Sequence, residues 1–431
     1  MLTDCDHFEP EKVNLHHFRH TRRGALALIA SGLLSACAPG TLQWGSRTLG
    51  WPERGGGAGQ GNVPGQTLQP APAQGIMGSG RTEVFGRGPV PVAMLMPLSG
   101  DAALAQVGVS LANAAKLAIG FIEANPNIGE NITITLHDSG SGAAGATSAA
   151  TAAVQAGAKL ILGPVSADQV SAAGAVARAA GIKLIGFANN PSVAGQGVFL
   201  LSVLPDMEMK RAIGYLKADG RRGLAGIFPA TPYGEALATA FRQQAIAAGF
   251  SPSAVYMFSD AGEAAQIAAQ AKPLIDRNAI DAIFLPERTS APAFAAALAQ
   301  AGAVAGEFLQ IVGSADWAGD AAILSAPALQ GAIYPAVDEA GYNAIAPEYA
   351  ARFGGRPHQL ATLAYTAVIL ANVNRLSLAT PPYDTTLLTA PGGYNGRDGQ
   401  FRFLANGRAE YALALRKVQA GGVVAVDGAK I

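Results

Sequence analysis

Small polar side chains follow several predicted strands of this sequence, each beside Gly or Pro. In the clearest stretch, 158–191, two apolar runs at 159–162 and 182–187 flank a predicted helix, a pattern typical of a parallel βαβ unit. The first run ends in Gly163-Pro164 and the second in Ala188-Asn189-Asn190-Pro191. Because ligands of such sheets bind beyond the carboxyl ends of the strands, we expect Ser166, Asn189 and Asn190 to contact a small polar ligand.

Ser166 also has a possible local role. Ser166 and Gln169 are spaced as a capping box, with Ser166 at the N-cap and Gln169 at the third helical position. That structural role alone would explain both residues. The two roles are compatible, because a capped helix N-terminus presents free N–H groups and the positive end of its dipole to an anion such as a carboxylate.

Other candidate residues lie at comparable places. Ser99, Ser139, Glu287 and Asp316 each follow a predicted strand, and Tyr233 opens a helix of the second half, where a buried packing role would also explain it. The full set of candidate ligand-binding residues is Ser99, Ser139, Ser166, Ala188, Asn189, Asn190, Tyr233, Glu287 and Asp316.

Catalytic and cofactor motifs are weak in this sequence. Residues 140–145 match G-x-G-x-x-G between a strand and a helix, but the acidic residue expected about twenty positions later is missing, so we favour a flexible ligand loop. There is no G-x-S-x-G motif, and His137 and His358 have no sequence partner that suggests a triad or a metal site. We expect no catalytic residue, no metal site and no cofactor.

Charge and cysteine content exclude further classes. The charges of thirty basic and thirty acidic residues cancel, so no global field draws the chain to nucleic acid. We therefore expect no nucleic acid as a partner. Cys5 and Cys37 are the only cysteines among 431 residues, too few for a disulfide framework.

The N-terminal region predicts export. A basic patch at 19–23 precedes the apolar run 25–34, which is too short to span a membrane as a helix. Residues 34–37, Leu-Ser-Ala-Cys, resemble a bacterial lipobox, which implies a signal peptide over 1–36, cleavage before Cys37 and lipid attachment to its sulfur. A plain signal peptide or a membrane anchor is the alternative. Ala38 after the cysteine points to the outer membrane, on its periplasmic side.

A flexible Gly/Pro-rich tether is predicted over 37–88. The acidic residues among the first eleven are unusual for a signal, so the true start codon could lie later, for example at Val13.

The remaining sequence alternates predicted strands and helices from residue 90, and the pattern restarts after Pro205. Such an order predicts two doubly wound α/β lobes with parallel sheets. The C-terminal part reads as short antiparallel strands with an Asn406-Gly407 turn.

Over 90–430 the sequence resembles the type I periplasmic binding proteins of the Leu/Ile/Val-binding branch. The motifs that carry the resemblance are Pro97-Leu98-Ser99-Gly100, the helix from Asn113 to Ala118, Gly163-Pro164 with Ser166, Ala188-Asn189-Asn190-Pro191, Tyr233-Gly234-Glu235 and the segment 398–426.

The resemblance implies lobes of 90–204 plus 338–377 and of 206–335 plus 382–431. Three crossings would join them, near 204–206, 335–338 and 377–382. It also implies that Ser166, Ala188 and Asn190 hold a ligand carboxylate, whereas Tyr233 and an acid near Glu287 take its ammonium group.

Within the superfamily, the lipobox, the tether and the segment LMPLSGDAALAQVG look most similar to the lipoprotein activators of penicillin-binding proteins. The first functional expectation is therefore an activator of a peptidoglycan synthase, with a penicillin-binding protein as partner and a lipid anchor in the membrane. The alternative is the substrate-binding lipoprotein of an ABC transporter for amino acids or similar small polar solutes.

Overall fold

The computed structural model describes residues 82–252, 254–303 and 308–431. The predicted signal peptide, Cys37 and most of the predicted tether lie outside these residues. The end of the tether prediction is wrong, because Glu83–Phe85 form strand β1, which pairs antiparallel with β3. Val84 is exposed, whereas Glu83 and Phe85 on either side of it are half-buried, an alternation that suits a short edge strand.

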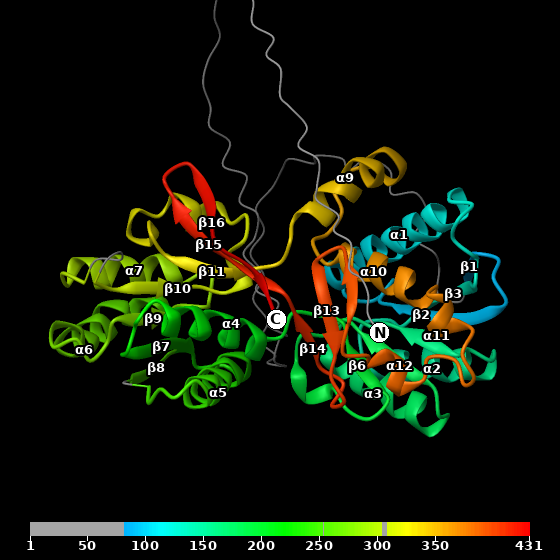
Figure 1. Ribbon diagram of the computed structural model, residues 1–431, viewed down its shortest axis with the longest axis horizontal. Helices are drawn as coiled ribbons and strands as arrows, with labels where there is room; N and C mark the ends of the chain where they lie inside the picture. Colours follow the sequence, from blue (N-terminus) through cyan, green and yellow to red (C-terminus); the bar gives the residue numbers. More distant parts are fainter. Residues whose placement is uncertain (1–81, 253, 304–307) are drawn as a thin grey trace, which may run out of the picture. The chain divides into compact units, whose positions relative to one another are not determined.

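The first lobe is built on a six-stranded sheet in the order β1-β3-β2-β4-β5-β6, parallel except for β1 (Figure 1). Its other strands are β2 (Val90–Met96), β3 (Ile132–Asp138), β4 (Leu160–Leu162), β5 (Lys183–Gly186) and β6 (Val198–Leu200). Both faces of the sheet are covered. Along β2, Met94 contributes to one buried cluster, while Ala93 and Leu95 contribute to another, which explains the nearly continuous apolar sequence.

The helices of the first lobe divide between these two faces. Helices α1 (Ala102–Ala124) and α10 (Ala361–Ala371) contribute to the cluster that contains Met94, and α2 (Ala143–Gln155) and α3 (Ala167–Ala179) contribute to the other. Helix α1 is long and apolar enough to cross a bilayer, but 61% of its most apolar window is buried inside the protein. We therefore interpret α1 as a core helix.

Shorter helical elements complete this lobe: η1 (Pro191–Val193), α9 (Ala340–Phe353), α11 (Asn374–Ser377) and α12 (Thr385–Leu388).

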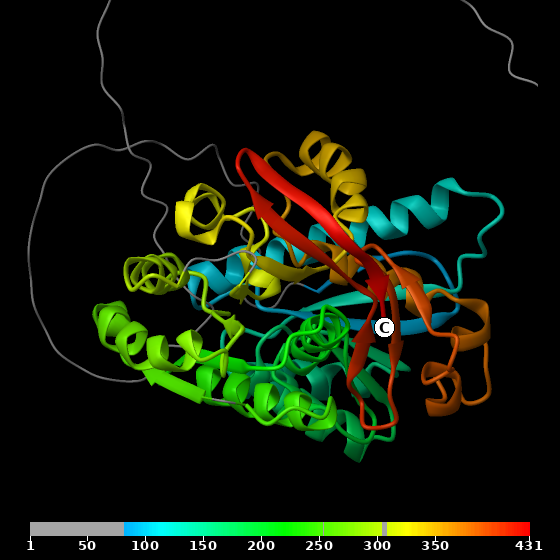
Figure 2. The same ribbon diagram turned by 60° about the vertical axis from the view of Figure 1, so that its left-hand side comes forward.

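The second lobe has a seven-stranded sheet in the order β16-β15-β11-β10-β9-β7-β8. Its strands are β7 (Leu224–Pro229), β8 (Ala254–Phe258), β9 (Ala282–Phe284), β10 (Gln310–Val312), β11 (Ile333–Ala336), β15 (Leu413–Gln419) and β16 (Gly422–Lys430). The first five pair in parallel, whereas β15 and β16 are antiparallel and lie side by side as a long ribbon (Figure 2).

Helices cover both faces of this sheet as well. Helices α4 (Pro205–Ala218) and α5 (Pro232–Ala247) contribute to one buried cluster, in which the Phe241 ring lies 5.6 Å from Phe228 and 5.0 Å from Phe284. Helices α6 (Ala264–Asp276) and α7 (Ala291–Gln300) contribute to the opposite cluster. The remaining short elements are η2 (Ala261–Glu263), η3 (Ala315–Trp317), α8 (Ala321–Ser325) and η4 (Pro327–Leu329). The predicted class, two α/β lobes with parallel sheets, is confirmed.

A third, three-stranded sheet corrects the predicted lobe boundary. Its strands are β12 (Tyr394–Gly396), β13 (Gly399–Phe403) and β14 (Ala409–Tyr411). Phe401, Phe403 and Tyr411 belong to the core of the first lobe, not to the second as expected for 382–431. Alternate apolar residues of β13 and β14 face that core, so the chain re-enters the second lobe only at Ala412–Leu413, where β15 begins, and not at 377–382.

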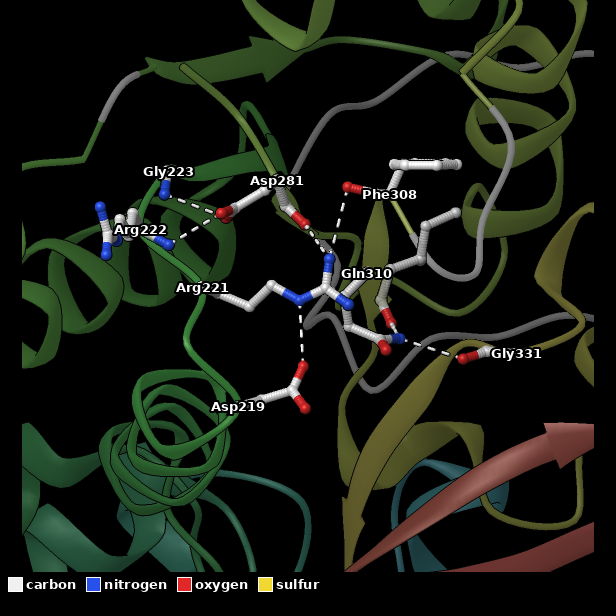
Figure 3. Close-up of polar contacts among 9 residues, drawn as sticks. Asp219, Arg221, Arg222, Gly223, Asp281, Phe308, Gln310 and Gly331 are labelled. Carbon is white, nitrogen blue, oxygen red and sulfur yellow. Dashed lines mark hydrogen bonds and ion pairs between the residues drawn. The ribbon is translucent and has the colours of Figure 1, made fainter. Parts of the chain in front are cut away.

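Polar contacts hold the amino ends of the second sheet's strands (Figure 3). The Asp281 carboxylate, just before β9, accepts hydrogen bonds from the N–H groups of Arg222 (2.8 Å) and Gly223 (3.0 Å), just before β7. Arg221 Nε donates to Asp219 at 3.0 Å, and Gln310 donates across to the Gly331 carbonyl at 3.0 Å. These contacts are structural, since ligands of such sheets bind at the opposite, carboxyl ends.

Candidate functional site

The candidate residues of the first lobe lie at one edge of its sheet, where the parallel strands β2, β3, β4 and β5 end. Ser166 is the N-cap of α3, and its hydroxyl accepts a hydrogen bond from the Gln169 N–H at 3.4 Å and contacts the Asp168 carboxylate. The Gln169 side chain does not complete the predicted capping box. It donates instead to the Gly140 carbonyl at 2.7 Å, which ties α3 to the loop after β3.

Asp138, at the end of β3, orders two neighbouring loops. Its carboxylate accepts hydrogen bonds from the N–H groups of Leu98 (2.9 Å) and Gly140 (2.8 Å). Burial pushes the pKa of Asp138 upward, but hydrogen bonds from Ser99, Gly140 and Leu98 outweigh it, so the pKa is lowered. Ser99 is therefore engaged with Asp138 and positions the loop that follows β2.

Exposure separates the first-lobe candidates into two groups. Ser139, Ser166 and Ala188 are buried, whereas Asn189 and Asn190 are exposed. The Asn190 side chain accepts a hydrogen bond from the Ser192 N–H at 3.0 Å and so caps η1. At this edge the two asparagines are thus open to solvent, whereas Ser139 and Ser166 are not.

The second-lobe candidates also follow strand ends. Tyr233 lies in the first turn of α5 after β7, Glu287 follows β9, and Asp316 lies in η3 after β10. The Glu287 carboxylate accepts hydrogen bonds from the N–H groups of Thr289 (3.0 Å) and Ser290 (2.6 Å), just before α7. Burial alone would raise the pKa of Glu287, but these hydrogen bonds hold it below its usual range.

Glu208 joins this group, although its sequence position did not suggest it. The residue lies in the first turn of α4, and its carboxyl accepts a hydrogen bond from the Ala315 N–H at 2.9 Å. Burial, with a smaller contribution from Asp316, raises the pKa of Glu208 to about 8 despite that bond. From sequence, an acid after Pro205 fits an ordinary helix N-terminus.

The four groups form one acidic set. Burial raises the pKa of Tyr233, and so do the nearby charges of Glu208, Asp316 and Glu287. Tyr233 as a whole is 38% exposed, so part of its side chain is open to solvent. Burial also raises the pKa of Asp316, opposed by Arg288, whose Nε lies 3.3 Å from Asp320. We call Glu208, Tyr233, Glu287 and Asp316 the acidic set.

The structure therefore gathers the predicted residues into two sets, one at the carboxyl edge of each sheet. Within the described residues, no group of three or more His, Cys, Asp or Glu side chains is placed to hold a metal ion. The G-x-G-x-x-G segment has a packing explanation, because a Cβ on Gly145 would lie 2.3 Å from the Ser139 carbonyl oxygen. A cavity of about 440 Å³ between α4, α5 and the C-terminal strands includes no predicted site residue.

Residues 89–422 match the protein family described as periplasmic binding protein. No curated protein sequence matches the chain. Solved structures share the fold. A candidate branched-chain amino acid ABC transporter protein of Rhodospirillum rubrum is 23% identical, with a TM-score of 0.66 over 78% of this chain and 99% of that one.

Two further structures were solved with ligands. The substrate-binding protein LivJ of Streptococcus pneumoniae, in complex with isoleucine, is 21% identical, with a TM-score of 0.53 over 78% of this chain and 99% of that one. A solute-binding protein of an R. palustris ABC transporter, in complex with benzoate, is 18% identical, with a TM-score of 0.54 over 80% and 98%. Membership of the matched family implies a ligand-binding fold and an extracytoplasmic location. The chain belongs to the periplasmic binding protein family, with the two-lobed α/β fold of type I.

Proposed function

We propose that this protein is a solute-binding component of an ABC-type transport system and that its ligand is a small amino-acid-like molecule. The observation that carries the proposal is the opposite polarity of the two sets of candidate residues. The set on the first sheet offers hydrogen-bond donors and a helix N-terminus, and the set on the second sheet is acidic. A zwitterion such as an amino acid complements both.

The first-lobe set suits a carboxylate. Helix α3 has thirteen residues, and its first turn presents N–H groups at the positive end of the helix dipole. Ser166 caps this turn, and the exposed side chains of Asn189 and Asn190 lie at the end of the neighbouring strand. Ser166, Ala188 and Asn190 remain our assignment for the carboxylate, with Ser99 and Ser139 as supporting residues.

The acidic set suits an ammonium group. The low pKa of Glu287 keeps that carboxylate ionised at neutral pH, and Asp316 lies close enough to raise the pKa of Tyr233. Two acids and a tyrosine hydroxyl provide acceptors for an ammonium, which donates three hydrogen bonds. The compared proteins were solved with isoleucine, which carries an ammonium group, and with benzoate, which has none. Both ligands are therefore included in the test.

Calorimetric titration of the purified chain with leucine, isoleucine, lysine and benzoate tests the proposal. We expect an amino acid to bind and Asp316→Asn to weaken it about ten- to hundredfold, since one hydrogen bond to a charged group contributes about 1.5–3 kcal/mol. Asp276→Asn is the matched control, because Asp276 is exposed and pairs with Lys272 in its own helix. Failure of every amino acid to bind at millimolar concentration, or equal affinities for the two variants, would contradict the proposal.

A second candidate is supported by the N-terminal sequence. A lipobox at Cys37 and a Gly/Pro-rich segment extending to about residue 82 would hold the folded part at a distance from an outer-membrane anchor. Such reach suits an activator that docks on a penicillin-binding protein. Deleting half of residues 40–85 should then abolish function in cells while the folded part still binds the synthase. Recovery of transporter subunits, and of no synthase, in a pull-down from membranes would favour transport.

A further inference from the structure

The loop that carries Asp316 is anchored by its buried neighbours. We call residues 313–317, which follow β10 and include η3, the Asp316 loop. Gly313, Ser314 and Trp317 of this loop are buried. Asp316 between them is exposed, although desolvation by the surrounding protein still raises its pKa. The loop thus presents one acid to solvent from an otherwise buried stretch.

Ser314 makes an unusual contact for its position. It is the N-cap of η3, where a serine hydroxyl ordinarily accepts an N–H group of the following turn. It makes no such bond to any residue that the structure describes. Its hydroxyl donates instead to the Pro286 carbonyl at 2.7 Å. Because Pro286 precedes Glu287, this buried bond joins the Asp316 loop to the loop that carries another member of the acidic set.

Trp317 anchors the other end of the loop. Its side chain is fully buried, and a Cβ on Gly313 would lie 2.2 Å from Trp317 Cδ2, so the indole lies directly against the Gly313 backbone. The ring centre also lies 6.2 Å from that of Tyr334 in β11. The indole N–H is buried with no hydrogen-bond partner among the described residues, which is unfavourable. Stability alone therefore does not explain an indole at this place.

Main-chain contacts hold the remaining sides of the loop. The Gly313 N–H donates to the Ile333 carbonyl of β11 at 2.8 Å, and the Ala315 N–H donates to Glu208 of α4 at 2.9 Å. Glu287 is held separately, because its carboxylate accepts N–H groups at the start of α7. The Ser314 bond therefore sets Asp316 relative to an acid that has its own support.

We propose that Ser314 and Trp317 are positioning residues of the ligand site: they hold Asp316 at a set place relative to Glu287 before any ligand binds. The inference rests on the proposed amino-acid-binding function, which assigns these acids to an ammonium group. An ammonium group then meets two acids already in place, and the loop loses little conformational freedom on binding. Such preorganisation raises affinity.

Hydrogen–deuterium exchange of the ligand-free full chain tests the order of the loop. In Ser314→Ala the protection of residues 313–318 should fall by roughly tenfold or more, because the hydroxyl that ties the loop to Pro286 is gone, while β7 and β9 stay unchanged. Ser325→Ala is the matched control, since Ser325 is exposed and donates to the Ala321 carbonyl of its own helix. Unchanged protection of 313–318 in Ser314→Ala would overturn the proposal.

Calorimetry separates positioning from a direct effect on the ligand. The probe is leucine, isoleucine or lysine, whichever binds the unaltered chain most tightly. Ser314→Ala should weaken binding by about tenfold in the unaltered chain, but by less than about twofold when it is combined with Asp316→Asn, because Ser314 acts through Asp316. Equal losses in the two backgrounds would contradict the assignment.

A second variant keeps the proposal testable if Ser314→Ala does not fold. Trp317→Phe removes part of the ring that lies against Gly313 and should give the same faster exchange of 313–318 and the same coupling to Asp316→Asn. Unchanged exchange in whichever variant folds would overturn the inference. Its failure alone would appear as normal binding with an unaltered loop, whereas failure of the proposed function would appear as no binding by the unaltered chain.

Discussion

Glu208 of α4 accepts a hydrogen bond from the N–H of Ala315, 107 residues later in the chain, at 2.9 Å. This bond connects the first helix of the second lobe to the loop that carries Asp316. It places two carboxyl groups together beside Tyr233, so the geometry of the acidic set depends on α4 as well as on the strand ends. A half-buried acid with a raised pKa makes folding stability depend on pH.

We predict that Glu208→Gln stabilises the protein at alkaline pH. Glu208 has an ordinary pKa of 4.5 and a pKa of about 8 in the fold, so between these values the folded state holds a proton that the unfolded state has lost. The stability that the folded state gains from holding this proton is therefore lost as pH rises from about 4.5 to 8. At pH 9 the variant should be more stable by roughly 1–4 kcal/mol, since full ionisation of a buried acid carries a cost of this order.

Urea denaturation at pH 5, 7 and 9 measures this difference. Glu235→Gln, at an exposed position in α5, is the control and should change stability little at any of the three pH values. A Glu208→Gln difference that stays constant with pH would mean that Glu208 is ionised throughout.

Ser166→Ala should destabilise the first lobe by about 1 kcal/mol, the usual effect of removing an N-cap side chain. The Ser166 hydroxyl accepts the Gln169 N–H, which would otherwise be buried without a partner. Ser171→Ala, at an exposed position of the same helix, should change stability by less than about 0.5 kcal/mol. Equal urea midpoints for the two variants would show that the cap contributes nothing.

Local patterns were sufficient for much of the fold. The alternation of apolar runs with Gly- and Pro-containing loops predicted the parallel sheets, and the spacing of Ser166 and Gln169 predicted Ser166 as N-cap of α3. Both features depend on residues a few positions apart, whose preferences are visible in sequence.

Long-range contacts were not visible in the same way. Nothing near Glu208 indicates that Ala315 will lie beside it, and the Gln169 side chain reaches the Gly140 carbonyl 29 residues earlier instead of its own helix start. The β13 strand was assigned to the wrong lobe for the same reason, since the apolar faces of Phe401 and Phe403 fit either core by sequence alone.

Cys37→Ser should release the protein from membranes or block its processing. The lipobox-like Leu-Ser-Ala-Cys follows an apolar run of signal length, and only the thiol of Cys37 can take the lipid in that pattern. Membrane fractionation with intact-mass measurement of the mature chain provides the readout. A variant that remains membrane-bound with the mass of the unaltered protein would exclude lipidation at this position.

Two helical glycines should respond to alanine in opposite directions. In α5, a Cβ on Gly234 would lie 1.8 Å from the Pro229 carbonyl oxygen at the end of β7, so the helix start fits against the strand only without a side chain. Gly234→Ala should therefore cost about 1–3 kcal/mol, as overpacking of a tight contact does.

The matched change lies in α4, where a Cβ on Gly214 would meet nothing within 4 Å. Gly214→Ala should stabilise the protein by about 0.5–1 kcal/mol, because alanine restricts the unfolded chain and favours helix.

Because Gly234 adjoins Tyr233, its substitution should also weaken binding of whichever amino acid the unaltered chain takes up, whereas Gly214→Ala leaves that affinity unchanged. Urea denaturation and calorimetry on the two variants check both effects, and a stable, fully binding Gly234→Ala protein would show that α5 can shift from β7 without disturbing the acidic set.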